Sequence, residues 1–330
     1  MTTSSIDWVG RVMTVRGAVE PDQLGVTLSH DHVIIDAWEF FGKPHYEVIL
    51  DDEQIMAEEL QLYRSAGGGA ICDPTNIGIG RNPEALRRVS EASGVNIVMG
   101  AGWYREKVYP SYVYDTSTNG LADMLVREIV DGVDGSGIRP GVIGEIGTER
   151  GAFSPANERV FRAAARAHLR TGCPILTHTT HWGELALEQL DLLAEEGVDA
   201  QHVVISHLGD RRGISWWLPI AERGAWLSID NLAFVEGYAP VAFRADNVAA
   251  LCAEGLAGQI MLSNDICALD QLATYGGVGY GNVLRNFLPL LRERGVSEDH
   301  IHQMLVENPR RAFQFCPPKA SPEPQSKVTS

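Results

Sequence analysis

Short runs of apolar residues alternate along the chain with longer segments in which apolar residues recur every three to four positions. The short runs are nearly continuous, as in strands of a sheet with both faces buried, and the longer segments have the spacing of amphipathic helices. The expected strands are 26–30, 70–73, 96–100, 141–145, 174–178, 202–207, 225–229 and 259–265. The expected helices are 51–65, 83–93, 121–130, 155–170, 183–196, 214–223, 243–254 and 283–294.

Eight strand–helix units in succession predict an α/β fold, a (β/α)8 TIM barrel. A doubly wound sheet is the alternative, but it needs a Gly-rich phosphate turn after an early strand, and the glycines at 67–69 precede one. The glycine-rich segment 276–281 lacks the Lys and Ser/Thr of a P-loop, so we expect a mobile or tightly turned loop after the last strand.

Both ends of the chain differ from the repeating units. Residues 8–24 alternate in polarity and predict a short hairpin that turns at Pro21-Asp22 and covers one end of the barrel. Prolines and polar residues after 315 predict a disordered tail. The expected organisation is a hairpin extension at 1–24, one barrel domain at 25–315 and a tail at 316–330.

Residue types that commonly bind metal ions stand at the ends of five expected strands. In the first strand two histidines are separated by one residue, so both imidazoles would face one site. Barrels of this kind build active sites at the carboxyl ends of their strands, which favours a shared metal site over unrelated core positions. The candidate ligands are His30, His32, Glu145, His178, His207 and Asp265.

Four imidazoles and two carboxylates exceed the needs of one catalytic zinc ion, which generally takes three protein ligands and water. We therefore predict two divalent ions, with zinc as first choice and manganese, cobalt or iron as alternatives. A hydroxide between them would be activated, and Asp265 could take its proton as general base or, alternatively, cap the next helix. In this hypothesis His30, His32 and Asp265 hold one ion, His178 and His207 hold the other, and Glu145 bridges both.

Charge and composition narrow the function classes. The formal net charge is −16 and there is no Lys/Arg cluster, which argues against nucleic acid or an anionic membrane and favours a small-molecule substrate. The chain shows no signal-peptide pattern and no spanning segment, so we expect a cytoplasmic protein. Five cysteines without CxxC spacing indicate reduced core thiols. The oligomeric state stays open, with a homodimer as one candidate.

Seven short motifs, spread over residues 8 to 315, carry a resemblance to a known family. They are 15–17, 24–32, 141–147, 177–178, 206–207, 262–265 and 307–311. With them the chain resembles the phosphotriesterase family of the amidohydrolase superfamily, in the glutamate-bridged branch of lactonase- and esterase-like members. The resemblance implies a binuclear metal hydrolase on a TIM barrel, with ligands at the six positions named above.

The bridging position departs from the better-known members, which use a carboxylated lysine where this chain has Glu145. Glutamate offers the same two oxygens without carbon dioxide, so we expect metal loading that does not depend on bicarbonate. No lysine lies on an expected barrel strand; the four lysines are Lys43, Lys107, Lys319 and Lys327.

Two further sites could either contact substrate or have only a structural role. Tyr104, after the third strand, resembles an aromatic that lactonase-like members place beside the leaving group or carbonyl oxygen; the alternative is a packed rim residue. The charged run at Asp210, Arg211 and Arg212 could contact a polar substrate, but we favour an ordinary exposed ion pair.

We expect a hydrolase in which the hydroxide attacks the carbonyl of a carboxylic ester or lactone. An N-acyl amide hydrolase is the second choice and a phosphotriesterase or phosphodiesterase the third, because activated hydroxide attacks carbonyl and phosphoryl centres alike. A non-enzymatic metal-binding barrel is the remaining alternative, disfavoured because all six ligand positions are filled. The loops 231–242 and 266–280 are expected to determine the substrate.

Overall fold

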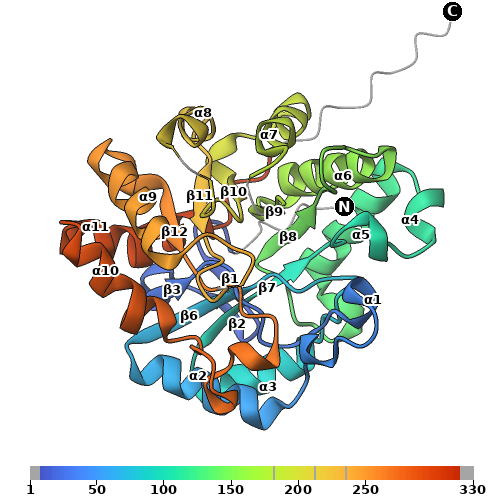
Figure 1. The fold of residues 1–330 in the computed structure, drawn as a ribbon. Helices are drawn as coiled ribbons and strands as arrows, with labels where there is room; N and C mark the ends of the chain where they lie inside the picture. Colours follow the sequence, from blue (N-terminus) through green and yellow to red (C-terminus); the bar gives the residue numbers. More distant parts are fainter. Residues whose placement is uncertain (1–7, 181–182, 212, 235, 320–330) are drawn as a thin grey trace, which may run out of the picture.

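In the computed structural model, eight parallel strands form one sheet that follows the order of the chain (Figure 1). The structure describes residues 8–180, 183–211, 213–234 and 236–319. The sheet closes where the Ser29 N–H donates to the Leu262 carbonyl at 3.5 Å and the Asp265 N–H donates to the His30 carbonyl at 3.1 Å. The predicted (β/α)8 barrel is confirmed. Its strands are β3 (Val26–Leu28), β6 (Gly68–Asp73), β7 (Asn96–Ala101), β8 (Val142–Gly147), β9 (Ile175–His178), β10 (Val203–Ile205), β11 (Trp226–Ile229) and β12 (Ile260–Leu262).

Helices surround the sheet on the outside (Figure 1). The helices that connect successive strands, or follow the last one, are α2 (Glu53–Ser65), α3 (Pro83–Ser93), α5 (Thr118–Asp131), α6 (Pro155–Thr171), α7 (Ala186–Glu195), α8 (Leu218–Glu222), α9 (Val241–Ala253) and α10 (Leu288–Glu293). Shorter helices are α1 (Trp38–Phe41), α4 (Tyr112–Asp115), α11 (Glu298–His302) and α12 (Asn308–Ala312). A small antiparallel pair, β4 (Ile35–Asp36) with β5 (Ile49–Leu50), follows the first barrel strand. None of the helices in the described part of the chain has the length and apolar character needed to cross a membrane.

Two expected helices are interrupted in the structure. The segment expected as 214–223 consists of a 3-10 turn at Ile214–Trp216 followed by α8, and 283–294 consists of a π-helical turn at Val283–Phe287 followed by α10. In each case the α-helix has a proline in its first turn, Pro219 or Pro289. Proline has no N–H to donate, so the α-helical hydrogen-bond pattern starts anew there.

The helix α6 shows how local sequence sets the ends of these elements. The Asn157 N–H donates to Ser154 Oγ at 3.0 Å, and Pro155 begins the first turn. Gly172 ends the helix with φ of +75°, and a side chain there would collide with the Cys316 carbonyl oxygen. The Cys316 N–H donates back to Gly172, and the Lys319 N–H donates to Leu169. The chain therefore stays bonded to the barrel into the predicted tail; residues 320–330 lie outside the described part.

The N-terminal hairpin is confirmed, but its turn is not where we predict it. Strands β1 (Val12–Thr14) and β2 (Gly17–Val19) pair with Thr14 opposite Gly17, so the turn is at 15–16. Gly17 has φ of +116°, a conformation that glycine adopts easily, whereas Pro21 begins a separate 3-10 turn. The alternation of polarity correctly predicted that the two segments pair. The prediction of the turn was wrong because it was based on Pro21 and Asp22.

One end of the barrel is filled with apolar side chains and the other is left for polar groups. The strands β6 to β12 each contribute one or two inward-facing residues to the filled end, and residues of the hairpin and of the last helix pack against them. This solid base makes the opposite, carboxyl end the place for a site. The cluster contains Val12, Leu24, Ala70, Cys72, Val98, Val142, Leu176, Val204, Trp226, Met261, Ala312 and Phe313.

Replacing the base residue Phe313 tests this packing. The side chain is fully buried, so Phe313→Ala should lower the free energy of unfolding by about 3–5 kcal/mol, measured by urea denaturation. Phe41→Ala is the matched control, since that ring is 49% exposed and its loss should cost less than about 1 kcal/mol. Equal losses in the two variants would contradict the proposed role of the base.

Candidate functional site

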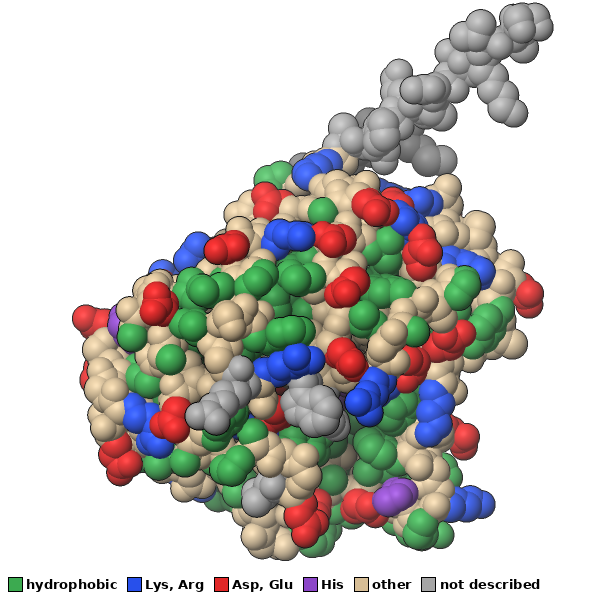
Figure 2. All heavy atoms as spheres, turned by 45° about the horizontal axis from the view of Figure 1, so that its top comes forward, with side chains coloured by type: hydrophobic (Ala, Val, Ile, Leu, Met, Phe, Trp, Pro, Cys, Tyr) green, Lys and Arg blue, Asp and Glu red, His purple; other side chains and the backbone are tan. Residues whose placement is uncertain are grey.

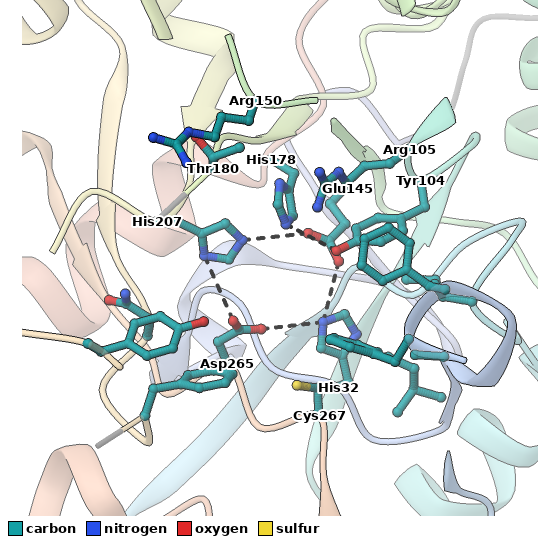
Figure 3. Close-up of a pocket in the computed structure, with 18 of the residues that line it drawn as sticks. His32, Tyr104, Arg105, Glu145, Arg150, His178, Thr180, His207, Asp265 and Cys267 are labelled. Atoms are coloured by element: carbon teal, nitrogen blue, oxygen red, sulfur yellow. Dashed lines mark hydrogen bonds and ion pairs between the residues drawn. The ribbon is translucent and has the colours of Figure 1, made fainter. Parts of the chain in front are cut away.

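The structure brings all six predicted ligand residues together at the carboxyl end of the barrel; Figure 3 labels five of them. His30 Nε2 lies 3.3 Å from Glu145 Oε2 and 3.6 Å from Asp265 Oδ1. His32 Nε2 lies 3.5 Å from the same Asp265 oxygen, and His207 Nε2 lies 3.8 Å from Glu145 Oε2. Side chains that are far apart in the sequence thus converge because neighbouring strands end at one level.

Three groups of three described residues have the spacing that a metal ion could bridge. In each group, one nitrogen or carboxylate oxygen per residue lies within 4.8 Å of the others. Two of the groups contain the residues that the hypothesis from the sequence assigns to separate ions, and Glu145 of one group also lies 3.3 Å from His30 Nε2 and 3.4 Å from His32 Nε2 of the other. These two groups are His30, His32 and Asp265, and Glu145, His178 and His207, and the third is His30, His207 and Asp230.

The chemistry of the cluster fits divalent cations. His30 Nε2, Glu145 Oε2 and His178 Nδ1 are buried and have no hydrogen-bond partner among the described residues. Buried polar atoms nearly always have a partner, so three such atoms in one cluster indicate a missing one. Mixed imidazole and carboxylate donors are suitable for zinc and its neighbours in the transition series.

The electrostatics of the cluster also indicate that Glu145 needs positive charge beside it. Burial by itself would raise the pKa of Glu145, but the adjacent His30, His207 and His178 outweigh it and hold this pKa well below its usual range. Burial, together with the positive charge of His207, keeps the pKa of His178 well below its usual range. The ionised Glu145 carboxylate therefore depends on positive charge close by, which either protonated histidines or bound metal ions can supply.

Each of the four histidines has its other ring nitrogen next to a fixed polar partner. Such partners set the ring orientation and the tautomer of a metal-binding imidazole. The pairs are His30 Nδ1 with Ser206 Oγ at 3.1 Å, His32 Nδ1 with Thr75 Oγ1 at 2.8 Å, His207 Nδ1 with Asp230 Oδ1 at 2.9 Å, and His178 Nε2 with the Tyr104 hydroxyl at 3.1 Å.

Asp230 belongs to this site although it is not among the six predicted ligands. Its Oδ1 accepts hydrogen bonds from both the backbone N–H and the ring Nδ1 of His207, each at 2.9 Å. Its Oδ2 lies 3.5 Å from His30 Nδ1. The signal was present, because Asp230 follows the apolar run 225–229 as the predicted ligands follow theirs. The carboxylate also raises the pKa of His207 well above its usual value, overcoming the effect of burial.

Asp31, between the two histidines of the first motif, closes the barrel rather than facing the site. Its carboxylate accepts hydrogen bonds from Ser263 Oγ at 2.6 Å and from the Ile266 N–H at 2.9 Å. Burial raises the pKa of Asp31 to about 7 against these hydrogen bonds. The contacts hold the segment that carries Asp265. The alternative role of Asp265 as a helix cap is wrong, because the next turn is Leu269–Gln271 and its N-cap is Ala268.

A cavity of about 460 Å³ opens over the cluster. Tyr104 lies in its wall, so the structure places this residue both beside the cavity and against His178. One part of the wall is apolar, from Ile35, Ala37, Phe40, Phe41, Ile79, Phe234 and Tyr238. Another part is polar, from Arg105, Arg150, Thr180, Glu184 and Asn231. The cavity therefore offers both apolar and polar side chains to a ligand.

The prediction for Asp210 is wrong. Its carboxylate is fully buried and pairs with Arg244 of α9, with Oδ1 to Nη2 at 2.8 Å. The partner lies 34 residues away in the sequence, so the local run of charges could not reveal it. Arg212 lies outside the described residues.

On the face shown in Figure 2, acidic and basic side chains are interspersed among apolar ones, consistent with the absence of a basic cluster from the sequence.

Known proteins resemble the chain over nearly its whole length. A "Phosphotriesterase homology protein" from Escherichia coli is 36% identical over 293 residues, 89% of this chain and 99% of that protein. Its solved structure, with phosphate in the active site, has a TM-score of 0.85 and covers 89% of this chain and all of that one. A zebrafish (Danio rerio) "N-acetyltaurine hydrolase" is 32% identical over 93% of this chain and 98% of its own.

A structural relative adds a second named activity. The structure of a lactonase from Listeria monocytogenes has a TM-score of 0.87 at 27% identity, over 92% of this chain and 99% of that one. The sequence profile of the phosphotriesterase family matches residues 10–313, which include all six predicted ligands. The resemblance seen in the motifs is confirmed, and the chain belongs to the phosphotriesterase family.

Proposed function

We propose that this protein is a hydrolase dependent on two divalent metal ions that cleaves a carboxylic ester or lactone. The observation that carries the proposal is the convergence of two ligand groups, with unpartnered buried atoms, beneath one cavity. Known relatives include a lactonase and an amide hydrolase, so carbonyl chemistry is represented on this fold. Zinc is our first choice of metal, with manganese, cobalt or iron as alternatives.

The chain's own residues would divide the work. His30, His32 and Asp265 would hold one ion, His178 and His207 the other, and Glu145 would contact both. Bound divalent ions lower the pKa of coordinated water and polarise a carbonyl or phosphoryl oxygen.

Asp265 and Tyr104 are the residues that we place beside the reacting groups. The Asp265 side chain is 15% exposed and lines the cavity, so its carboxylate is accessible to take a proton from the attacking water. The Tyr104 hydroxyl lies 3.1 Å from His178 Nε2, and the side chain lines the same cavity. We propose that it contacts the leaving group or the carbonyl oxygen.

An N-acyl amide with an anionic end is the second candidate substrate. Arg105 lines the cavity near His178, close enough for its charge to contribute to lowering the pKa of that histidine. Arg150, also in the wall, lies 3.8 Å from Glu184. These cations are suitable partners for an acid group on the amine portion, and the similarity to N-acetyltaurine hydrolases favours the same class. Phosphoesters are the third candidate, supported by the phosphate in the bacterial relative's active site.

Other inferences from the sequence stay predictions. They are a cytoplasmic location, a small-molecule substrate in preference to nucleic acid or membrane, and an oligomeric state that includes a homodimer among its candidates.

Glu145→Gln tests the bridge. The amide cannot supply two anionic oxygens, so metal content by elemental analysis should fall from about two ions per chain to about one or fewer. Glu184→Gln is the matched control, since Glu184 lines the cavity outside the ligand groups and should leave metal content unchanged. Loading of the unaltered protein should be equal with and without bicarbonate. A bicarbonate requirement, or unchanged metal content in Glu145→Gln, would contradict the bridge.

Asp230→Ala tests the support of His207. Loss of the carboxylate frees the imidazole to rotate, so metal affinity should fall about 10–100-fold in competition with a chromophoric chelator. Asp191→Ala serves as control, because that side chain is 58% exposed and pairs with Arg223 on the surface. Equal affinities in both variants would show that Asp230 does not orient the ligand.

Product analysis separates the candidate substrates. The metal-loaded protein is given a γ-lactone, an aryl ester, an N-acyl amide with a sulfonate group and a phosphotriester. We expect a carboxylate and an alcohol from the first two, with activity lost on chelation and restored by metal. A larger rate of amine release would favour the second candidate, and release of a phosphodiester the third. Tight metal binding without turnover of any substrate would indicate the non-enzymatic barrel.

A further inference from the structure

A buried ion pair lies beneath the segment that connects β11 to α9. Both side chains, Arg244 and Asp210, are fully buried. The Arg244 Nε–H donates to Asp210 Oδ1 at 2.8 Å, and its Nη1–H donates to the carbonyls of Asn231 at 2.7 Å and Phe234 at 3.0 Å. Asp210 Oδ1 also accepts from the Ala239 N–H at 3.1 Å. The pair therefore binds the connecting segment near its beginning and near its end.

That segment provides one wall of the cavity. Asn231, Phe234 and Tyr238 all line it. The rings of Phe234 and Tyr238 stack with their centres 4.5 Å apart, and the Arg244 guanidinium lies 5.6 Å from the Tyr238 ring centre. The Asn231 side-chain amide donates to Asp210 as well. All three wall residues are thus connected to the ion pair by hydrogen bonds or by direct ring contact.

The geometry needs an arginine. A guanidinium presents several N–H donors in a fixed plane, so it can bind one carboxylate and two carbonyls together, whereas a lysine ammonium offers a single point charge. A buried charge is tolerated only when it is paired and its hydrogen bonds are made. Burying both charges costs free energy of desolvation, which a connecting segment on the surface does not require. The pair lies behind the cavity wall, so we look for its role in holding that wall.

We propose that the Arg244–Asp210 ion pair is a positioning device: it holds the Phe234–Tyr238 wall in place and so determines how tightly the cavity binds the apolar part of a ligand. The inference rests on the proposed function in taking this cavity as the substrate site. It makes Arg244 and Asp210 specificity-determining residues that do not touch the reacting groups. Neither residue is among the ligand candidates, so metal binding should be independent of them.

The test uses zinc-loaded protein and two carboxylate probes, acetate and octanoate, with dissociation constants from calorimetry. The variants are Arg244→Met, which removes the charge and the donors, and Arg244→Lys, which keeps the charge. The matched control is Asp246→Asn, on the same helix, whose carboxylate is 65% exposed and pairs with Arg294 at 2.6 Å. Hydrogen exchange of the Ala239 amide gives a readout that needs neither ligand nor turnover.

We expect the unaltered protein and Asp246→Asn to bind octanoate more tightly than acetate. In Arg244→Met, octanoate affinity should fall about tenfold while acetate affinity changes less than about twofold, and Arg244→Lys should be intermediate. Ala239 exchange should accelerate at least about tenfold in Arg244→Met, with metal content unchanged.

Three results would overturn the proposal. The first is that the unaltered protein binds acetate and octanoate equally. The second is that each Arg244 variant loses affinity for the two probes to the same extent, and the third is that both Arg244 variants lose zinc. A protein that shows the expected probe selectivity but hydrolyses no substrate would refute the proposed function and leave this inference standing.

Discussion

Closure of the barrel between its first and last strands is the constraint on which the site depends. Asp31 fixes how the two strands join. Its buried carboxylate accepts hydrogen bonds from Ser263 and from the backbone N–H groups of Asn264 and Ile266, which lie 232 to 235 residues away in the sequence. This contact puts the histidines on either side of Asp31 next to the carboxylate of Asp265. A metal site assembled from both ends of a chain requires such a fixed junction, since small displacements of ligands weaken binding.

The loops above the site are held by buried charges in a similar way. Glu59 of α2, almost fully buried, accepts hydrogen bonds from the Thr274 N–H at 2.7 Å and the Ala273 N–H at 3.1 Å, both in the loop after β12. Arg244 donates hydrogen bonds to the carbonyls of Asn231 and Phe234 in the segment after β11. Both connections were expected to determine the substrate, and both are anchored to neighbouring helices or strands. A wall fixed in advance binds ligand without the cost of ordering it.

Much of this architecture could be predicted because it is locally encoded. Continuous apolar runs marked the eight barrel strands, and the alternation with helical segments indicated a barrel. Errors arose where local signals compete, as in the hairpin whose turn lies at 15–16 instead of Pro21 and in the two helices interrupted at Pro219 and Pro289. In each case a proline was present, and its effect on hydrogen bonding was misjudged or passed over.

The fold class, the family and the identity of six residues that converge at one end of the barrel could be predicted from the sequence. The fold class and the six residues follow from periodicity and from residue type at strand ends, and the family follows from the resemblance of its short motifs; all are properties of short segments. The tertiary structure alone decided the partners: Asp230 beneath His207, and Arg244 with Asp210 behind the cavity wall. Such pairs depend on which strands and helices become neighbours, and no local pattern records that, because the contacts form between segments that only the closed barrel brings together.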